Sequence, residues 1–404
     1  MNKISDRIKY WLQIFLIPLY WISFLTPRSR KIWVLGSTFG RRYADNARYF
    51  YLYLDEFEKK SIRPIWISRK KEIVRFLKEN GKEAYYVRSI KGVYYCLRAK
   101  VYIFDNYSKD ICFWLSGGAR KVNLWHGAGN KATNFDNRFD YLRHPRNFRE
   151  YISTAITRMS NEKPSHYILA TSPTYRDIFA SAFQVPKEHI IIEGYPRNVA
   201  MLNENIDKLL TGAEEKNLQI ITGHKNKGEK VVVYMPTFRN TETMFFDVVN
   251  LEKFNIFLRE KNIFFMTKMH PKSKAKKEFQ RVEFTNIYNI DSDVDPYTFL
   301  EDVDMLVTDY SSVFSDFSLL NRPTIIFPFD YKEYSSGTRD EYVPFNEYIK
   351  VTKVYSQAEL EKSMERLLEK DTDYEGRKWL LERTFSSQDE ESSKRLCEKI
   401  KEII

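Results

Sequence analysis

The chain has 404 residues, a formal net charge of +11 and 43% hydrophobic residues, with 14 Gly and 14 Pro. This length and composition exclude a disordered or repetitive protein and leave room for two domains of ordinary size. The positive charge indicates an anionic partner: nucleic acid, a membrane surface or a phosphate-bearing substrate. Cys96, Cys112 and Cys397 are odd in number and far apart, which argues against a disulfide framework and a zinc site and favours a reducing cytoplasm.

The N-terminal segment is apolar and aromatic, with basic residues on both sides. Its apolar run, residues 10–25, is interrupted by Pro18 and is shorter than the ~20 residues that a spanning helix needs. Residues 26–30 lack the small-residue cleavage site of a signal peptide. We therefore expect residues 1–30 to associate with the membrane as an interfacial helix, which places the protein peripherally on the cytoplasmic face. A buried core helix and a full membrane span are the alternatives.

From residue 31 onward, short β-branched apolar runs alternate with helical stretches. This pattern predicts an α/β fold with parallel sheets covered by helices on both faces. The expected strands are residues 32–36, 64–68, 84–87, 101–106, 121–125, 167–171, 190–193, 230–235, 263–268, 285–290, 305–308 and 324–327.

This pattern predicts two doubly wound Rossmann-type domains that face each other across a cleft. We expect the N-terminal domain at residues 31–200 and the C-terminal domain at residues 230–377. The polar stretch at residues 201–229 is predicted to be a linker, and residues 378–404 a helical tail.

The stretch from 303 to 323 predicts a strand, a turn and a helix that begins at Val313. Thr308, Asp309, Ser311 and Ser312 lie in the turn, where hydroxyl groups and free backbone N–H groups suit a phosphate. The plainer interpretation is that Ser311 or Ser312 only caps the helix, which is expected to end near residue 321.

Three further polar motifs follow predicted strands. They are residues 125–131, 236–239 and 268–271, and ligands of parallel sheets bind beyond the carboxyl ends of the strands. Two of the six histidines, His126 and His270, belong to these motifs. His126 suits proton removal near neutral pH, and Gly127 after it would let a substrate approach the backbone.

Basic side chains beside His270 suit a phosphoryl group. Arg239 offers a planar fork of donors and Lys268 a point charge, so both would neutralise a phosphate that His270 contacts. A histidine at a strand end is more often structural than catalytic, and this interpretation remains open for both histidines.

The order and spacing of these motifs resemble the CDP-glycerol glycerophosphotransferase family of teichoic acid and capsule polymer synthesis. The resemblance covers roughly residues 30–340. It rests on Trp125-His126-Gly127, Gly194-Tyr195-Pro196-Arg197-Asn198, Pro236-Thr237-Phe238-Arg239, His270-Pro271, and Thr308 to Ser312 followed by Asp316-Phe317.

This resemblance implies a GT-B fold and the transfer of a polyol phosphate, expected to be glycerol phosphate, from a CDP-activated donor with release of CMP. It implies that His126 takes the proton of the acceptor hydroxyl and that His270, with Arg239 and Lys268, stabilises the phosphate charge. The residues expected to bind substrate are Gly127, Arg197, Thr237, Arg239, Lys268, Thr308, Asp309, Ser311, Ser312 and Asp316.

The expected partners are CDP-glycerol or CDP-ribitol, a lipid-linked glycopolymer acceptor and the cytoplasmic membrane surface, without nucleic acid, cofactor or metal ion. The chain departs from the family pattern at residues 128–131 and at Val199, which leaves its fine specificity open. The basic block at residues 137–149 suits an anionic acceptor, lipid headgroups or plain solvation.

Four other functions remain as alternatives. A GT-B enzyme that uses a nucleotide sugar would share the fold, and a metal-dependent GT-A enzyme would use Asp291, Asp293 or Asp295. A non-enzymatic membrane or nucleic-acid binder would rely on the net charge. A hydrolase with Ser312 as nucleophile lacks the flanking glycines of a nucleophile elbow.

Overall fold

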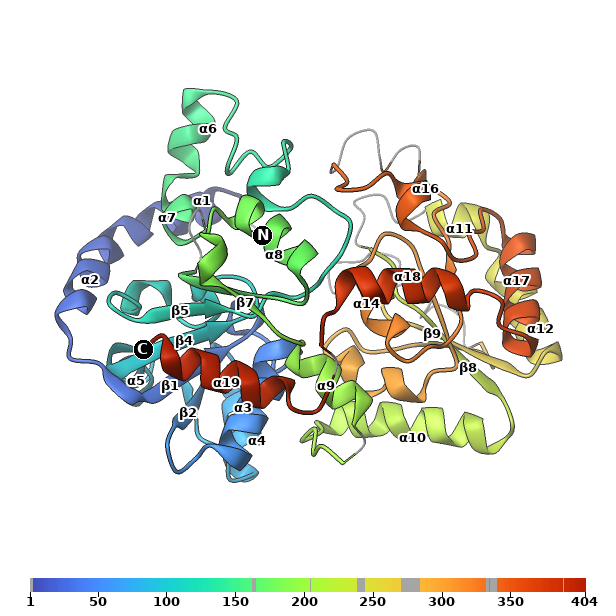
Figure 1. The fold of residues 1–404 in the computed structure, drawn as a ribbon, viewed down its shortest axis with the longest axis horizontal. Helices are drawn as coiled ribbons and strands as arrows, with labels where there is room; N and C mark the ends of the chain where they lie inside the picture. Colours follow the sequence, from blue (N-terminus) through green and yellow to red (C-terminus); the bar gives the residue numbers. More distant parts are fainter. Residues whose placement is uncertain are drawn as a thin grey trace. The chain divides into compact units, whose positions relative to one another are not determined.

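The structure is a computed structural model, and it describes residues 3–161, 165–203, 205–237, 244–269, 284–331, 334, 340–387 and 389–404. The chain divides into two compact units. Unit 1 contains Met1–His126, Thr133–Lys208 and Phe385–Ile404, and unit 2 contains Gly127–Ala132 and Leu209–Thr384. Each unit is built around one parallel sheet with helices packed against it (Figure 1).

The sheet of unit 1 has seven parallel strands in the order β3-β2-β1-β4-β5-β6-β7. Its centre is apolar on both faces, because Trp33, Val34 and Leu35 of β1 are all fully buried. The strands are β1 (Ser29–Gly36), β2 (Arg63–Ser68), β3 (Ala84–Tyr86), β4 (Ala99–Phe104), β5 (Arg120–Asn123), β6 (Tyr167–Ala170) and β7 (Ile190–Ile192).

The helices of unit 1 cover this sheet and include the C-terminal one, which packs against α3 and α9. Helix α3 buries most of its side chains, so it belongs to the core of the unit. The helices are α1 (Lys3–Leu12), α2 (Ile17–Ile22), α3 (Asp45–Phe57), α4 (Lys71–Glu79), α5 (Ile90–Arg98), α6 (Phe148–Ser153), α7 (Ala155–Asn161), α8 (Pro173–Phe183), α9 (Pro196–Leu202) and α19 (Ser392–Glu402).

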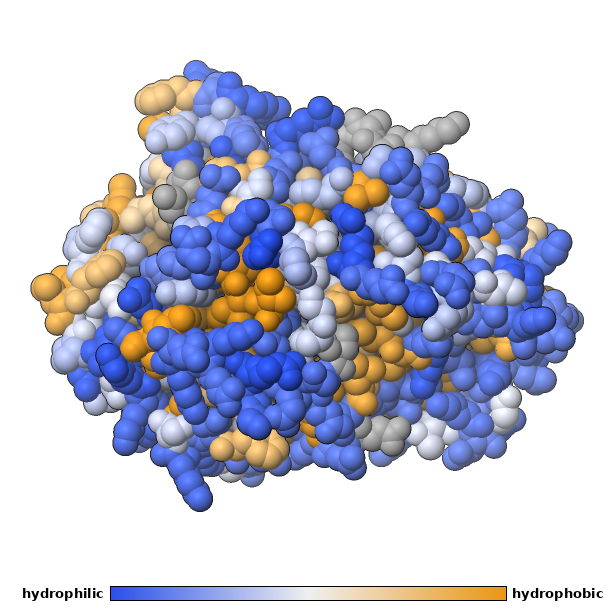
Figure 2. Space-filling model, viewed as in Figure 1, coloured by the Kyte–Doolittle hydropathy of each residue, from blue (hydrophilic) through white to orange (hydrophobic). Residues whose placement is uncertain are grey.

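The N-terminal segment forms two short α-helices, α1 and α2, separated and followed by single 3-10 turns. Its window Ile8–Leu25 is long and apolar enough to cross a membrane, yet only 6% of it is buried. The alternative of a buried core helix is therefore wrong. Figure 2 shows the apolar side chains as orange atoms along the left edge, where Figure 1 places α2.

The sheet of unit 2 has five parallel strands in the order β10-β9-β8-β11-β12. The strands are β8 (Lys230–Tyr234), β9 (Ile263–Thr267), β10 (Ile287–Asn289), β11 (Met305–Thr308) and β12 (Thr324–Ile326). Its core packs side chains of these strands against helices α12 and α17. The helices are α10 (Gly212–Asn226), α11 (Met244–Val248), α12 (Leu251–Glu260), α14 (Val313–Ser318), α16 (Phe345–Tyr348), α17 (Gln357–Glu369) and α18 (Tyr374–Thr384).

All twelve predicted strands are present, each within three residues of its expected ends, and the α/β fold class with two doubly wound parallel sheets is confirmed. The structure divides the chain differently at three places. Residues 127–132 belong to unit 2, and residues 385–404 return to unit 1. The predicted linker contains α10, and a capping box formed by Thr211 and Glu214 stabilises the N-terminus of this helix.

Candidate functional site

In unit 1, His126 follows β5 on a strained turn. Trp125 has a φ of +54°, a left-handed conformation that costs a bulky residue ~1–3 kcal/mol. Two buried side chains hold this turn: Asn46 Nδ2 donates to the carbonyl oxygen of Trp125 at 2.8 Å, and Arg197 Nη1 donates to that of His126 at 3.0 Å. The Trp125 ring packs edge-on against Phe183 at 4.6 Å between ring centroids. The surrounding protein therefore maintains the strain.

The hydrogen bond of the His126 ring determines its tautomer. Nδ1 lies 3.1 Å from the carbonyl oxygen of Asp105, directly after β4. A carbonyl oxygen only accepts, so Nδ1 carries the hydrogen and the neutral ring has its lone pair on Nε2. The side chain is exposed. This arrangement suits a general base that works through Nε2.

Arg197 was expected to bind substrate, and the structure places it inside unit 1 with an exposed fraction of 1%. Its Nη1 also donates to Asp45 Oδ1 at 2.6 Å, and its backbone N–H donates to Asn46 Oδ1 at 3.2 Å. Arg197 therefore connects the loops that follow β1, β5 and β7. These contacts are those of a positioning residue, and its substrate role remains a prediction.

Asn46 and Asp105 support the same turn and were missed by the sequence prediction. Asp105 is fully buried, and its Oδ1 accepts from the N–H of Ala47 at 2.9 Å. Desolvation and the nearby Asp45 carboxylate raise the pKa of Asp105. The available signal was the position of Asp105 at the end of an apolar strand, where polar residues gather around a ligand site.

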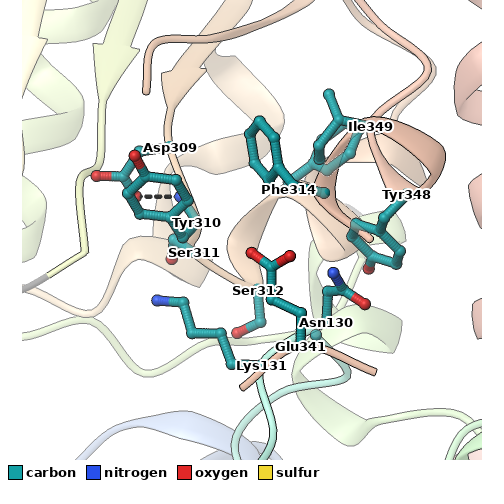
Figure 3. Close-up of a pocket in the computed structure, with 12 residues that line it drawn as sticks. Asn130, Lys131, Asp309, Tyr310, Ser311, Ser312, Phe314, Glu341, Tyr348 and Ile349 are labelled. Atoms are coloured by element: carbon teal, nitrogen blue, oxygen red, sulfur yellow. Dashed lines mark hydrogen bonds between the residues drawn. The ribbon is translucent and has the colours of Figure 1, made fainter. Parts of the chain in front are cut away.

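In unit 2, a pocket lies between residues 129–131 and the turn after β11 (Figure 3). Residues 130–132 run antiparallel to residues 340–343. Ala132 N donates to Asp340 O at 2.8 Å, and the Asn130 amide exchanges hydrogen bonds with the backbone of Val343. The other lining residues are Asp309, Tyr310, Ser311, Ser312, Phe314, Glu341, Phe345, Tyr348 and Ile349.

Gly127 was expected to let a substrate approach the backbone. In the structure the close approach is to the protein itself, because a Cβ atom at Gly127 would clash with Ser312 Oγ. A Cβ atom at Gly129 would lie 3.0 Å from Ser312 Cβ. Both glycines therefore let residues 127–132 pass over the start of α14.

Lys131 is the cation of this pocket, and the sequence prediction missed it. Its Nζ donates to Thr237 Oγ1 at 2.8 Å and lies 5.1 Å from the ring centroid of Tyr334, which stacks on Tyr310. Figure 3 shows the Lys131 side chain extending toward Tyr310 and Ser311. The signal was the lysine at the end of the motif that contains His126.

Glu341 contributes a carboxylate to the same pocket. Desolvation raises the pKa of Glu341, and the charge of Lys131 opposes that shift. A carboxylate repels phosphate but accepts hydrogen bonds from hydroxyl groups. The pocket therefore suits a ligand that carries both phosphate and hydroxyl groups.

Asp309 and Thr308 hold the two loops that form the pocket. The Asp309 carboxylate accepts from the backbone N–H of Thr237 at 2.9 and 3.0 Å, and also from that of Tyr310. Thr308 Oγ1 donates to the carbonyl oxygen of Met235 at 2.7 Å. Both residues are buried, so they fix the loops after β8 and β11.

Lys268 and Asp316 are also buried and bonded within unit 2. Lys268 Nζ donates to the carbonyl oxygens of Asp291 and Ser292 at 2.9 and 2.8 Å, and Tyr297 OH donates to Asp316 Oδ2 at 2.5 Å. Within the described ranges, no three His, Cys, Asp or Glu side chains are placed to hold a metal ion.

Ser311 and Ser312 line the pocket. Ser312 is the N-cap residue of α14, but its side chain makes no cap hydrogen bond, and Ser311 Oγ lies 3.5 Å from the N–H of Val313. Of the two serines predicted as possible caps, Ser312 does not cap the helix, whereas Ser311 accepts this long hydrogen bond from its first residue. Helix α14 ends at Ser318, earlier than expected, and Asn321 takes a left-handed φ of +51° in the following turn. His270 and Arg239 lie outside the described residues.

Comparisons with known proteins show the family to which the chain is similar. Residues 19–402 match the family described as CDP-Glycerol:Poly(glycerophosphate) glycerophosphotransferase. A teichoic acid poly(glycerol phosphate) polymerase of Bacillus spizizenii is 27% identical over 82% of this chain and 83% of that protein. A teichoic acid glycerol-phosphate transferase of Staphylococcus aureus is 26% identical over 89% of this chain and 90% of that protein.

The fold is also found among solved structures. The wall teichoic acid polymerase TagF superposes with a TM-score of 0.73 at 21% sequence identity, covering 99% of this chain and 97% of that one. This likeness supports the GT-B-like fold class expected from the motifs. The match over nearly the whole length shows that the chain is a transferase and belongs to the CDP-glycerol:poly(glycerophosphate) glycerophosphotransferase family.

Proposed function

We propose that this protein transfers glycerol phosphate from CDP-glycerol to a hydroxyl group of a membrane-linked cell-wall polymer and releases CMP. The observation that carries the proposal is the hydrogen bond from His126 Nδ1 to the Asp105 carbonyl oxygen. It makes Nε2 the atom that accepts a proton, on a turn that Asn46 and Arg197 hold in position.

In the proposed reaction, the acceptor oxygen attacks the donor phosphorus that bears the glycerol, while His126 Nε2 takes the hydroxyl proton. The new bond joins the acceptor oxygen to phosphorus. The bond between this phosphorus and the bridging oxygen breaks, and CMP leaves with the electron pair. Such a transfer depends mainly on positioning and on stabilisation of charge.

The pocket of unit 2 would hold the donor. Lys131 would neutralise a phosphate oxygen, and the hydroxyl groups of Ser311 and Ser312 would donate to the same group. Glu341 would accept from a hydroxyl group of the ribose or the polyol. As predicted from the sequence, Arg239 and His270 would stabilise the charge of the phosphate or of the departing CMP.

Turnover of different donors tests the reaction. Purified protein would receive CDP-glycerol, CDP-ribitol or a UDP-sugar with an acceptor that ends in glycerol phosphate, and release of CMP or UDP would be measured. We expect CMP release with CDP-glycerol. Preferred turnover of CDP-ribitol would correct the polyol, and UDP release alone would overturn the proposal.

A histidine substitution tests the base. His126→Gln should lower kcat by about 10²- to 10⁴-fold, because general base catalysis contributes that range. His224→Gln is the matched control, since His224 lies near the end of α10, before the start of β8, and stacks on Phe264. An equal loss in both variants, or no loss in His126→Gln, would contradict the assignment.

We also propose that the N-terminal segment attaches the protein to the cytoplasmic membrane surface. Several apolar side chains of the segment are exposed, among them Trp21 at 63% and Leu25 at 83%. The segment is docked on unit 1, because Tyr20 stacks on Phe113 at 4.5 Å and Ser23 Oγ accepts from Gly117 N at 2.9 Å. The combined change of Trp21→Ser and Leu25→Ser should weaken binding to lipid vesicles, and unchanged binding would rule the attachment out.

A further inference from the structure

A second cluster of polar side chains lies at the opposite edge of the unit 1 sheet from His126. Arg28 precedes β1, Lys121 is the second residue of β5, His166 precedes β6 and His189 precedes β7. All strands of this sheet are parallel, so their first residues share one edge. The proposed reaction uses none of these side chains.

Lys121 is the most unusual member of this cluster. Its exposed fraction is only 8%, and its Nζ lies 5.5 Å from the ring centroid of Tyr20 and 5.4 Å from that of Phe113. In the part of the chain that the structure describes, no acceptor atom forms a hydrogen bond with this Nζ. Desolvation and the charge of Arg28 lower the pKa of Lys121 to about 8. At neutral pH the group is thus a buried charge that has no anionic partner among the described residues.

The groups around Lys121 add a cation and a neutral hydrogen-bond donor. Arg28 donates to backbone carbonyl oxygens, among them those of Ala99 and Leu115 at 2.7 and 2.9 Å. His166 Nδ1 accepts from the N–H of Lys121 at 3.0 Å, which leaves the ring hydrogen on Nε2 as a donor. Desolvation and the nearby Lys121, Arg120 and His189 side chains lower the pKa of His166 to about 4, so its ring is neutral at neutral pH.

An apolar surface lies beside these cations. Tyr20 and Phe113, the rings against which Lys121 packs, join the globular unit to α2. Trp21, Ile22 and Leu25 of the same segment are more than half exposed. A free phosphate would gain nothing from this surface, whereas a phosphate attached to acyl chains would contact both the cations and the apolar side chains.

We infer that Arg120, Lys121, His166 and His189, the amino-edge cluster, bind the phosphate group of an anionic phospholipid. The inference rests on the proposed membrane attachment of the N-terminal segment. The lipid phosphate would pair with the Lys121 charge, which has no anionic partner in the described ranges, and the Nε2–H of His166 would supply a second donor. The N-terminal segment places the acyl chains next to its own apolar side chains.

Vesicle binding tests this site. The full chain would be mixed with vesicles of phosphatidylcholine alone or with added phosphatidylglycerol, and the partition coefficient would be measured by co-sedimentation. Lys121→Met removes the charge, while the thioether can still pack against the two rings. Lys253→Met is the matched control, because it removes one charge from an exposed lysine of unit 2.

We expect Lys121→Met to lower partitioning onto phosphatidylglycerol vesicles about fivefold, the factor typical of one cation near an anionic surface. Partitioning onto phosphatidylcholine should not change, and Lys121→Arg should restore the wild-type value. An equal effect of Lys121→Met and Lys253→Met would overturn the lipid site. Full competition by millimolar inorganic phosphate would also overturn it, in favour of a free-anion site.

The outcomes also separate this site from the proposed function. Wild-type protein that binds neither kind of vesicle would overturn both the membrane attachment and the lipid site. If the protein binds vesicles through the N-terminal segment and Lys121→Met binds them as well as the wild type does, the lipid site alone is overturned. CMP release with a water-soluble acceptor should be the same in Lys121→Met and wild type, because Lys121 lies at the opposite edge of the sheet from His126.

Discussion

Two candidate functional regions, around His126 in unit 1 and around Lys131 in unit 2, use buried polar side chains in the same way and present different chemistry. In unit 1, Arg197 and Asn46 hold a strained turn so that one imidazole has a defined tautomer. In unit 2, Asp309 joins two loops, and the pocket presents a lysine, hydroxyl groups and a carboxylate.

This difference separates proton transfer from substrate binding. A base needs one nitrogen in one orientation, so many residues position a single ring. A nucleotide donor offers several charged and polar groups, so several side chains share its binding. Substitutions in unit 1 should therefore change kcat, whereas substitutions in unit 2 should change KM for the donor.

Apart from replacement of His126 itself, the largest effect is expected for Arg197→Met, which tests whether Arg197 positions the His126 turn. The change removes a buried pair with Asp45, so the free energy of unfolding should fall by about 3 kcal/mol. A displaced His126 should lower kcat about 10²-fold while KM for the donor stays nearly constant. Denaturant unfolding and steady-state kinetics measure both, and a rise in KM alone would mean that Arg197 binds substrate.

Lys131→Met tests the proposed donor pocket. A hydrogen bond to a charged group contributes ~1.5–3 kcal/mol, so KM for CDP-glycerol should rise about 10- to 100-fold. The value of kcat should change little, and Lys131→Arg should recover part of the affinity. Initial rates over a range of donor concentrations give both constants. A decrease in kcat without a rise in KM would contradict the proposal that unit 2 binds the donor while unit 1 supplies the base.

Asp309→Asn separates positioning from donor contact. Asparagine keeps one acceptor oxygen but turns an NH₂ group toward a backbone N–H, so the free energy of unfolding should fall by ~1–3 kcal/mol. Chemical denaturation measures this loss, and the exposed Asp247→Asn provides the control. If stability is unchanged while donor affinity falls as far as in Lys131→Met, Asp309 is a ligand instead.

Ser312→Ala should have the smallest effect. Since the Ser312 side chain makes no cap hydrogen bond, the free energy of unfolding should stay within about 0.5 kcal/mol of the wild type. Loss of a true cap would lower it by ~1 kcal/mol. KM for the donor should rise a few-fold, because one hydroxyl donor to the phosphate is lost. Thermal unfolding and donor titration distinguish the two roles.

Much of the fold could be predicted because its signals are local. The strands from β1 to β12 are short runs of β-branched and aromatic residues between turn residues, and twelve of twelve were found. The turn after β11 was found for the same reason, since a strand, two serines and a helix follow one another directly. Residues 201–229 were missed as helical because α10 has a weak apolar face.

The amino-acid sequence by itself determined the parallel sheets, the apolar character of the N-terminal segment and the position of His126 at a strand end, because each depends on neighbouring residues. Only the tertiary structure decided that Arg197, Asp309 and Lys268 are buried and that Lys131 faces the pocket. The physical reason is that burial and hydrogen bonding depend on segments that are distant in the sequence. Asp45 accepts a hydrogen bond from Arg197, and Asp309 accepts one from the N–H of Thr237. Residues 130–132 form hydrogen bonds with residues 340–343 and so belong to unit 2.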